Sequence, residues 1–344
     1  MDKKLGKSAR VGIRDVAAAA GVSPTTVSHA LSGARAINPA TRARVLEVAQ
    51  ELGYSPDLRA RGLRSSRTFT VGLLSDTIAV TPYAGLIISG AQDAAAEHQS
   101  VVLALDSTGD PQRELLGIRT LLDHRVDGLV YARMSHQSVN VPKELDEIPV
   151  VLANASSPDL KFSSVVPDEN QIGLDATAHL LSFGHERVGF ATVNENVPSA
   201  LGREEGYRSA MRAAGIAVNE AWVCAKTGDA AGGREAGRLI LDREDRPTAI
   251  FCFNDEIAMG VYQAANDLGL RIPEDLSVIG VDDLQLITQA LVPTLSTIAL
   301  PHYQMGHWAV SQLFTQATAQ NGARIAEKLR SHLVQRESVK APRS

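Results

Sequence analysis

The 344-residue sequence is poor in several features that mark particular classes of protein. It has only two cysteines, Cys224 and Cys252, and their spacing suits neither a metal site nor a redox pair, which fits a reducing compartment. No run approaches the roughly 18 apolar residues that a membrane span needs. The first residues are charged and lack the apolar stretch of a secretory signal. We therefore expect a cytoplasmic protein that does not associate with a membrane.

Motifs that carry catalysis are also missing from the sequence. The patterns GxSxG, GxxxxGK[ST] and HExxH do not occur, and no GxGxxG follows a predicted strand. The nine histidines show no spacing typical of metal ligands. These absences disfavour an enzyme, and the sequence predicts neither a cofactor nor a bound metal.

Charge is distributed unevenly along the chain, although the formal net charge is only −5. Residues 1–68 contain 12 lysines and arginines against 5 aspartates and glutamates, whereas the remaining residues contain 22 against 34. A basic segment attached to an acidic body predicts that the N-terminal part alone meets a polyanion. The length of the chain also predicts two or three domains.

A helix-turn-helix pattern lies inside this basic segment. Apolar residues from Ile13 to Ala20 repeat at helical spacing, and Gly21 ends the run. Ser23 is a suitable N-cap for a second helix, and Pro24 suits its first turn. One face of this second helix is apolar, and the other carries short polar side chains: Thr25, Thr26, Ser28 and His29. A helix that packs on one side and presents polar groups on the other is typical of a DNA-recognition helix.

The run from Ile13 to Gly33, with TRARVLEVAQELGYSP at 41–56, resembles the N-terminal domain of the LacI/GalR family of bacterial repressors. The resemblance continues along the chain, in DGLV at 127–130, GH at 184–185, FNDE at 253–256 and SVIGVDD at 277–283. It implies that residues 11–56 form a DNA-binding headpiece. The residues expected to contact base edges are Pro24, Thr25 and His29, and those expected to contact the DNA backbone are Ser23, Thr26, Ser28 and Tyr54.

A third helix and a hinge are expected to complete the headpiece. Asn38 begins this helix and Gly53 ends it, and its predicted buried face consists of Val45, Val48, Ala49 and Leu52. In residues 57–68, four arginines and Gly62 disfavour an autonomous helix. The resemblance implies that this segment folds only on DNA, where Leu63 enters the minor groove between Arg61 and Arg64.

From residue 69 onward, buried-strand patterns alternate with amphipathic helices. This alternation predicts parallel, doubly wound sheets, and the strand–helix units are too many for a single sheet. We therefore expect an α/β core at 69–338 with two doubly wound subdomains, which the resemblance identifies as periplasmic-binding-protein-like. The expected N-subdomain covers about 69–168 plus 300–327, and the C-subdomain about 169–297 plus 328–338.

Polar residues stand where predicted strands end, and ligands bind at such ends in open α/β sheets. Five of them directly follow a strand: Asp76, Asn154, Asp168, Asn254 and Asp282. Arg203 is expected to open a helix after another strand. Asp and Asn at such turns are equally ordinary helix caps, and Arg203 has a second interpretation, as a structural ion pair with Asp282. The resemblance implies an effector pocket lined by Asn154, Arg203, Asn254 and Asp282, with the ring of Tyr83 and with His302 nearby.

An arginine, a carboxylate and amides suit paired hydroxyls, so a sugar or a nucleoside fits this pocket better than a strongly anionic molecule. We predict a sequence-specific transcription regulator, a repressor by resemblance, controlled by such a small-molecule effector. Its partners are a palindromic operator in double-stranded DNA and a second copy of the chain. No heptad repeat follows the core, so a homodimer is expected rather than a tetramer.

Two other classes of protein remain as alternatives. A solute-binding protein for transport shares the expected core, but the basic helix-turn-helix and the missing secretory signal argue against it. A Rossmann-type enzyme lacks its phosphate-binding glycines. The residues leave open whether transcription is repressed or activated, and whether the effector releases the DNA or tightens its binding.

Overall fold

The computed structural model describes residues 11–32, 35–54, 67–318 and 323–343. The chain divides into two compact units, one ending at Phe69 and one beginning at Thr70. In the described residues, no helix is both long and apolar enough to span a bilayer.

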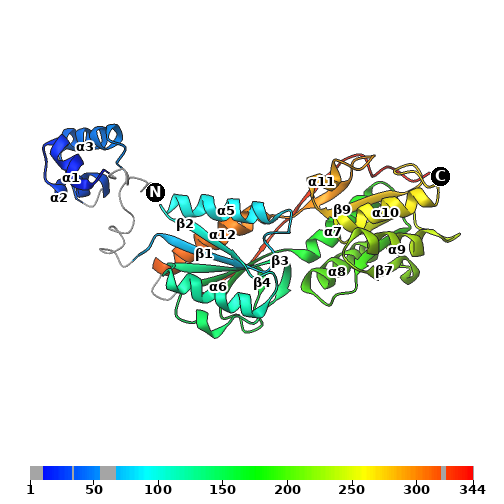
Figure 1. Ribbon diagram of the computed structural model, residues 1–344. Coiled ribbons are helices and arrows are strands. Elements are labelled where there is room, and N and C mark those ends of the chain that lie inside the picture. The colour runs from blue at the N-terminus through cyan, green and yellow to red at the C-terminus, as the bar shows by residue number, and fades with distance from the viewer. Residues whose placement is uncertain (1–10, 33–34, 55–66, 319–322, 344) are drawn as a thin grey trace, which may run out of the picture. The chain divides into compact units, whose positions relative to one another are not determined.

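The first unit contains three helices, α1 (Ile13–Ala20), α2 (Pro24–Ser32) and α3 (Pro39–Glu51) (Figure 1). Gly21 ends α1 with φ +64°, a left-handed conformation that glycine adopts without steric cost. The Ser23 hydroxyl accepts a hydrogen bond from the Thr26 amide at 3.0 Å, which caps α2 as predicted. The predicted helix-turn-helix is therefore present.

The core of this unit is small and made of short side chains. All three helices contribute to it, through Val16, Ala17, Ala20, Val27, Ala30, Val45 and Ala49. The prediction that Leu52 belongs to this core is wrong, because Leu52 is 37% exposed. Helix α3 ends at Glu51, and Leu52 is its C-cap. Leu52 therefore does not continue the buried face of the helix.

The N-subdomain of the second unit is a parallel sheet between two layers of helices (Figure 1). Its strands are β1 (Thr70–Ser75), β2 (Val101–Asp106), β3 (Gly128–Ser138), β4 (Val150–Ser156), β5 (Ser163–Pro167) and β11 (Ala326–Leu329), in the order β11-β5-β4-β3-β1-β2. One face is covered by α5 (Ala84–Glu97) and α12 (His302–Thr318). The other is covered by α6 (Pro111–Asp123) and the short η1 (Lys143–Leu145).

The C-subdomain repeats this three-layer arrangement. Its strands are β6 (Val188–Val193), β7 (Val223–Lys226), β8 (Ala249–Cys252), β9 (Ser277–Asp282), β10 (Ser296–Ala299) and the antiparallel β12 (His332–Val334), in the order β12-β10-β9-β8-β6-β7. Helices α7 (Glu169–Ser182) and α8 (Pro198–Ala213) cover one face, and α9 (Ala230–Leu241) and α10 (Asp255–Asp267) cover the other. The short elements are η2 (Glu220–Trp222) and α11 (Gln285–Thr288).

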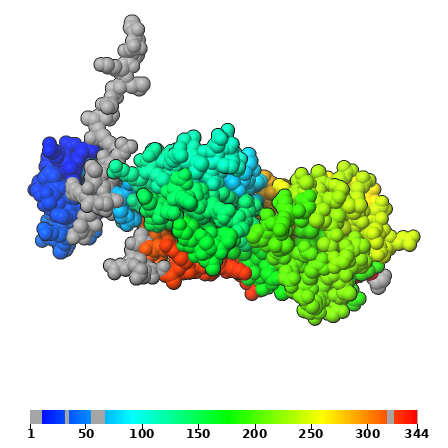
Figure 2. Space-filling view, turned by 90° about the horizontal axis from the view of Figure 1, so that it is seen from below, coloured from blue at the N-terminus to red at the C-terminus, as the bar shows by residue number. Residues whose placement is uncertain are grey.

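The chain passes between the two subdomains three times, after β5, after β10 and after β11. For this reason the orange and red C-terminal residues lie on the surface of the green and cyan N-subdomain in Figure 2. Two doubly wound α/β subdomains are confirmed. The prediction that Arg203 opens a helix is wrong, because α8 begins at Pro198 and Arg203 lies in its second turn. Proline suits the first helical position, which explains the earlier start.

Candidate functional site

Helix α2 exposes the face that the sequence assigned to DNA. Ser23, Pro24 and Thr25, at its N-terminus, are exposed, whereas Val27 is fully buried in the core. The other predicted contact residues are half-buried, namely Thr26, Ser28, His29 and Tyr54. An exposed helix N-terminus of this kind is the part of a helix-turn-helix that reaches base edges. The predicted minor-groove residues Arg61, Leu63 and Arg64 lie outside the described residues.

In the core, a cavity of about 180 Å³ lies between the two subdomains at the carboxyl ends of their strands. The predicted effector residues that line it are Tyr83, Asn154, Arg203, Asn254 and Asp282. Lining residues that the sequence did not predict include Ser135, His136, Glu169 and Phe253. Both subdomains therefore supply polar side chains to one cavity.

Arg203 and Glu169 form a buried ion pair beside this cavity. Arg203 Nε donates to Glu169 Oε2 at 2.8 Å, and the exposed fractions of the two side chains are only 4% and 5%. Arg203 Nη1 donates to the carbonyl oxygen of Phe253 at 2.6 Å, and the guanidinium lies 4.4 Å from the centre of the Phe253 ring. The partner of Arg203 is therefore Glu169, and not Asp282 as the structural interpretation of the sequence supposed.

Glu169 also links the two subdomains. Its Oε1 atom lies 3.2 Å from Nδ1 of His136, a residue of β3 in the N-subdomain. Burial alone would raise the pKa of the Glu169 carboxyl, but Arg203 and His136 together hold this pKa below its ordinary value. Glu169 is therefore a buried carboxylate with a cation on one side and an imidazole on the other.

The close approach of α7 and α8 brings Glu169 and Arg203 together. A methyl group on Gly173 would lie 2.0 Å from the carbonyl oxygen of Arg203, and one on Gly202 would lie 2.5 Å from Cβ of Glu169. Only glycine permits the two helices to touch at these points. The spacing of glycines on α7 and α8 thus sets the geometry of the ion pair.

The two amides of the cavity differ in how they are held. Asn254 caps α10, since its Oδ1 accepts from the Ile257 amide at 2.7 Å and its Nδ2 donates to the Gly228 carbonyl at 2.8 Å. Asn154 is 2% exposed and has a left-handed backbone with φ +53°. Its Oδ1 has no hydrogen-bond partner among the described residues. A buried acceptor without a partner is costly, so this atom marks a place for a ligand donor.

Asp282 reaches the cavity from a strained turn. The φ angles of Asp282 and Asp283 are +116° and +57°, a region that favours glycine. Asp255 accepts from the Leu284 amide at 2.7 Å, and Arg336 donates to Asp283 at 2.6 Å, which holds the turn in place. Burial raises the pKa of the Asp282 carboxyl to about 7, against the effect of Arg203 and with a contribution from Glu169.

Three predicted effector residues are not among the cavity-lining residues of the described chain. His302 is 1% exposed and stacks on the Tyr83 ring at 4.3 Å between centroids, and burial lowers its pKa to about 4. Asp168 caps α7 by accepting from the Gln171 amide at 3.3 Å. For these two residues and for Asp76, contact with the effector therefore stays a prediction.

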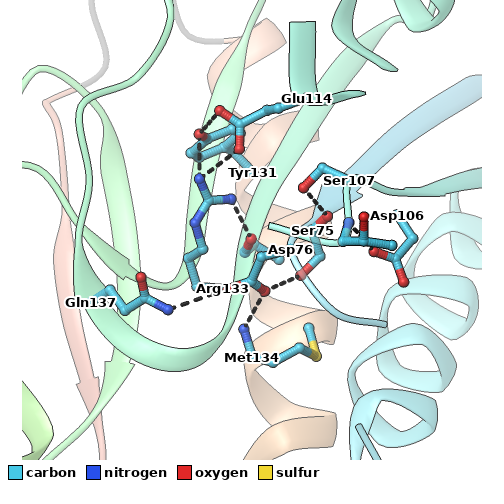
Figure 3. A network of polar contacts seen from close by, with 11 residues as sticks. Ser75, Asp76, Asp106, Ser107, Glu114, Tyr131, Arg133, Met134 and Gln137 are labelled. Carbon is cyan, nitrogen blue, oxygen red and sulfur yellow. Dashed lines mark hydrogen bonds and ion pairs between the residues drawn. The ribbon is translucent and has the colours of Figure 1, made fainter. Parts of the chain in front are cut away.

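Asp76 belongs to a network of polar contacts in the N-subdomain, which Figure 3 shows. Its carboxylate accepts from the Met134 amide at 3.0 Å and from the Gln137 side chain at 3.2 Å. These residues belong to an irregular stretch of β3, where the pairing with β4 shifts register. On the same stretch, Arg133 is anchored to Glu114 at 2.8 Å. Asp76 therefore positions the neighbouring residues Ser135 and His136 that line the cavity.

Sequence reasoning missed Glu169 and His136 for understandable reasons. Glu169 follows Asp168 at the start of a helix, and acidic residues are ordinary in a first turn because they complement the helix dipole. The partner of His136 is Glu169, which lies 33 residues further along the sequence. The residues next to His136 in the sequence therefore do not distinguish it from a solvated histidine. Only the approach of α7, α8 and β3 in space identifies them.

Comparisons with known proteins cover both parts of the chain. Residues 12–57 match the model for bacterial regulatory proteins of the lacI family, and residues 177–339 match the periplasmic binding protein-like domain. The ribose operon repressor of Haemophilus influenzae is 32% identical over 95% of this chain and 98% of its own length. The chain belongs to the LacI family of bacterial regulatory proteins.

Solved structures of LacI-family proteins resemble this one throughout the core. A transcriptional regulator of the family from Rhizobium etli has 32% identity and a TM-score of 0.72, and the match covers 80% of this chain and all of that one. The complex of the regulator CelR with cellobiose has 28% identity and a TM-score of 0.70, over 96% of this chain and all of that one. This LacI-family protein is a DNA-binding transcription regulator controlled by a small-molecule effector, as predicted.

Proposed function

We propose that this regulator is a cytoplasmic repressor without enzymatic activity, which binds a palindromic operator as a homodimer. Residues 11–56 bind DNA, residues 57–68 form the hinge and residues 69–338 bind the effector. The effector is an uncharged polyhydroxyl molecule, such as a sugar or a nucleoside, held in the cavity between the subdomains. Its binding changes operator affinity only to the extent that it favours one arrangement of the subdomains over the other.

The observation that carries this proposal is the set of polar groups around the cavity. Asn154 offers a buried Oδ1 acceptor that lacks a partner in the described chain. Burial raises the pKa of the Asp282 carboxyl to about 7, and its protonated form can donate a hydrogen bond as well as accept one. A hydroxyl is likewise donor and acceptor, so vicinal hydroxyls match these groups. The ring of Tyr83, which lines the cavity and is backed by the stacked ring of His302, supplies an apolar side for a sugar or a base.

Asn154 provides the direct test of this pocket. Asn154→Gly removes the side-chain acceptor and suits the left-handed backbone at this position. We expect effector affinity to fall about tenfold or more, which is ~1.4 kcal/mol, while operator affinity in the absence of effector stays unchanged. The effector is first found by thermal shift over a panel of sugars and nucleosides, since a ligand of the native state raises Tm.

The matched control is Leu160→Gly, at another left-handed position of the N-subdomain, where the side chain is 67% exposed and outside the cavity. It should leave effector affinity as in the wild type. Equal effector affinity in Asn154→Gly and the wild type would place the effector elsewhere.

The headpiece assignment is tested at His29. In His29→Ala we expect sequence preference to relax at one operator position, with ~1–3 kcal/mol less discrimination there. Ser28→Ala, at a predicted DNA-backbone contact, should instead weaken binding to all sequences alike. Selection of binding sites from random DNA measures both, and a His29→Ala sequence logo identical to that of the wild type would refute the base contact.

A further inference from the structure

The side chain of Glu169 occupies the part of Arg203 that acids ordinarily bind. A guanidinium receives a carboxylate or a phosphate through two neighbouring N–H groups, either along the Nε/Nη2 edge or at the Nη1/Nη2 end. Nε already donates to Glu169 at 2.8 Å, and Nη1 already donates to the Phe253 carbonyl at 2.6 Å. The protein itself therefore takes up the single N–H group of Nε at the first position and one of the two N–H groups of Nη1 at the second.

The carboxylate of Glu169 is also fixed in place. His136 contacts its Oε1 atom from the N-subdomain at 3.2 Å, while Oε2 faces Arg203. The side chain is 5% exposed, and Gly202 lets its Cβ atom pack directly on α8. An acidic ligand would have to break the contacts of Glu169 with both subdomains before it reached the Nε edge.

Charge acts in the same direction as geometry. The positive charge of Arg203 is neutralised by Glu169, and the same cavity is lined by two further carboxyls, those of Glu195 and Asp282. An incoming phosphate or carboxylate would therefore find no net positive charge at the Arg203–Glu169 pair, and it would be repelled by the ionised forms of the other carboxyls. An uncharged hydroxyl avoids this repulsion and needs only one donor, which Nη2 of Arg203 can supply.

We propose that Glu169 is a specificity-determining residue of the effector cavity, which excludes phosphate esters and carboxylates and leaves the cavity to uncharged hydroxylated molecules. This inference rests on the proposed function, because it assigns the effector class of the same cavity. Glu169 acts through Arg203: it takes up the Nε donor and neutralises the positive charge that would attract an acid.

Inorganic phosphate is the probe that tests this without knowledge of the effector. Phosphate affinity is measured by isothermal calorimetry on the full chain at constant ionic strength, for the wild type, E169Q and E205Q. E169Q keeps the shape of the side chain but removes its charge. E205Q removes the same charge from a residue of α8 that is 59% exposed and outside the cavity. We expect E169Q to bind phosphate at least tenfold more tightly than the wild type, and E205Q to match the wild type.

Equal phosphate affinity in E169Q and the wild type would overturn the proposal. If E169Q does not fold, the same comparison is made with E169A, which removes both the charge and the acceptor of Nε, and phosphate binding at least tenfold tighter than in the wild type is again expected. The outcome is separate from that of the proposed function. If E169Q gains phosphate binding, the role of Glu169 is supported even when Asn154→Gly leaves effector affinity unchanged. If Asn154→Gly lowers effector affinity but E169Q does not gain phosphate binding, only the role of Glu169 is refuted and the proposed function stands.

Discussion

Replacing Arg203 with methionine is expected to lower the free energy of unfolding by ~3–5 kcal/mol and to abolish the effector response. The loss arises because Glu169 would remain buried without its cation, and removal of one partner of a buried pair costs this much. Contact with His136 offsets part of the cost, since its Nδ1 atom stays within 3.2 Å of Glu169 Oε1. Urea unfolding followed by fluorescence and circular dichroism measures the change.

The double variant Arg203→Met with Glu169→Met separates stability from binding. Two apolar side chains of similar volume replace both charges, so most of the lost stability should return. The effector response should stay absent, because the cavity has lost its guanidinium. A fully stable single variant would contradict the ion pair, and a double variant with normal effector response would contradict the role of Arg203 in the pocket.

Gly173→Ala is expected to have the second largest effect. The new methyl group would lie 2.0 Å from the Arg203 carbonyl oxygen, so α7 and α8 must move apart. Overpacking of this kind costs ~1–3 kcal/mol. The movement also separates Glu169 from Arg203, so effector affinity should fall at least tenfold. Thermal unfolding and effector titration measure the two effects.

Gly85→Ala is the matched control for this substitution. Gly85 lies in α5, and a methyl group there would have no atom within 4 Å. Alanine favours a helix over glycine, so this variant should be at least as stable as the wild type. If Gly173→Ala behaves like Gly85→Ala, the helix contact does not set the ion pair.

Most of the fold follows from local patterns in the sequence. The regular alternation of buried strands and amphipathic helices from residue 69 onward suffices to predict two doubly wound sheets, because each pattern reports a face that must be covered. Ser23 as a helix cap and Gly21 as a helix end depend on neighbours a few residues away. Leu52 was wrongly assigned to the buried face of α3 because the helix ends one residue earlier, at Glu51. Helix ends are the least certain part of such patterns.

The cavity could be predicted only in part. The ends of parallel strands meet at one edge, which places Asn154, Asn254 and Asp282 together. The choice between neighbours in the sequence depends on packing instead, so Asp168 caps a helix whereas Glu169 faces the cavity. Asp76 also stands at the end of a strand, but its carboxylate accepts hydrogen bonds from the irregular part of β3.

The central claim is that an uncharged molecule in the cavity controls the affinity of this regulator for its operator. The most direct test measures operator affinity by fluorescence anisotropy, with DNA selected from genomic fragments, in the presence of each uncharged sugar and nucleoside of the panel. We predict that at least one compound changes the operator Kd of the wild type tenfold or more, and that the same concentration has little effect on Asn154→Gly. The claim is contradicted if none of these compounds changes the operator Kd, or if the change is equally large in Asn154→Gly.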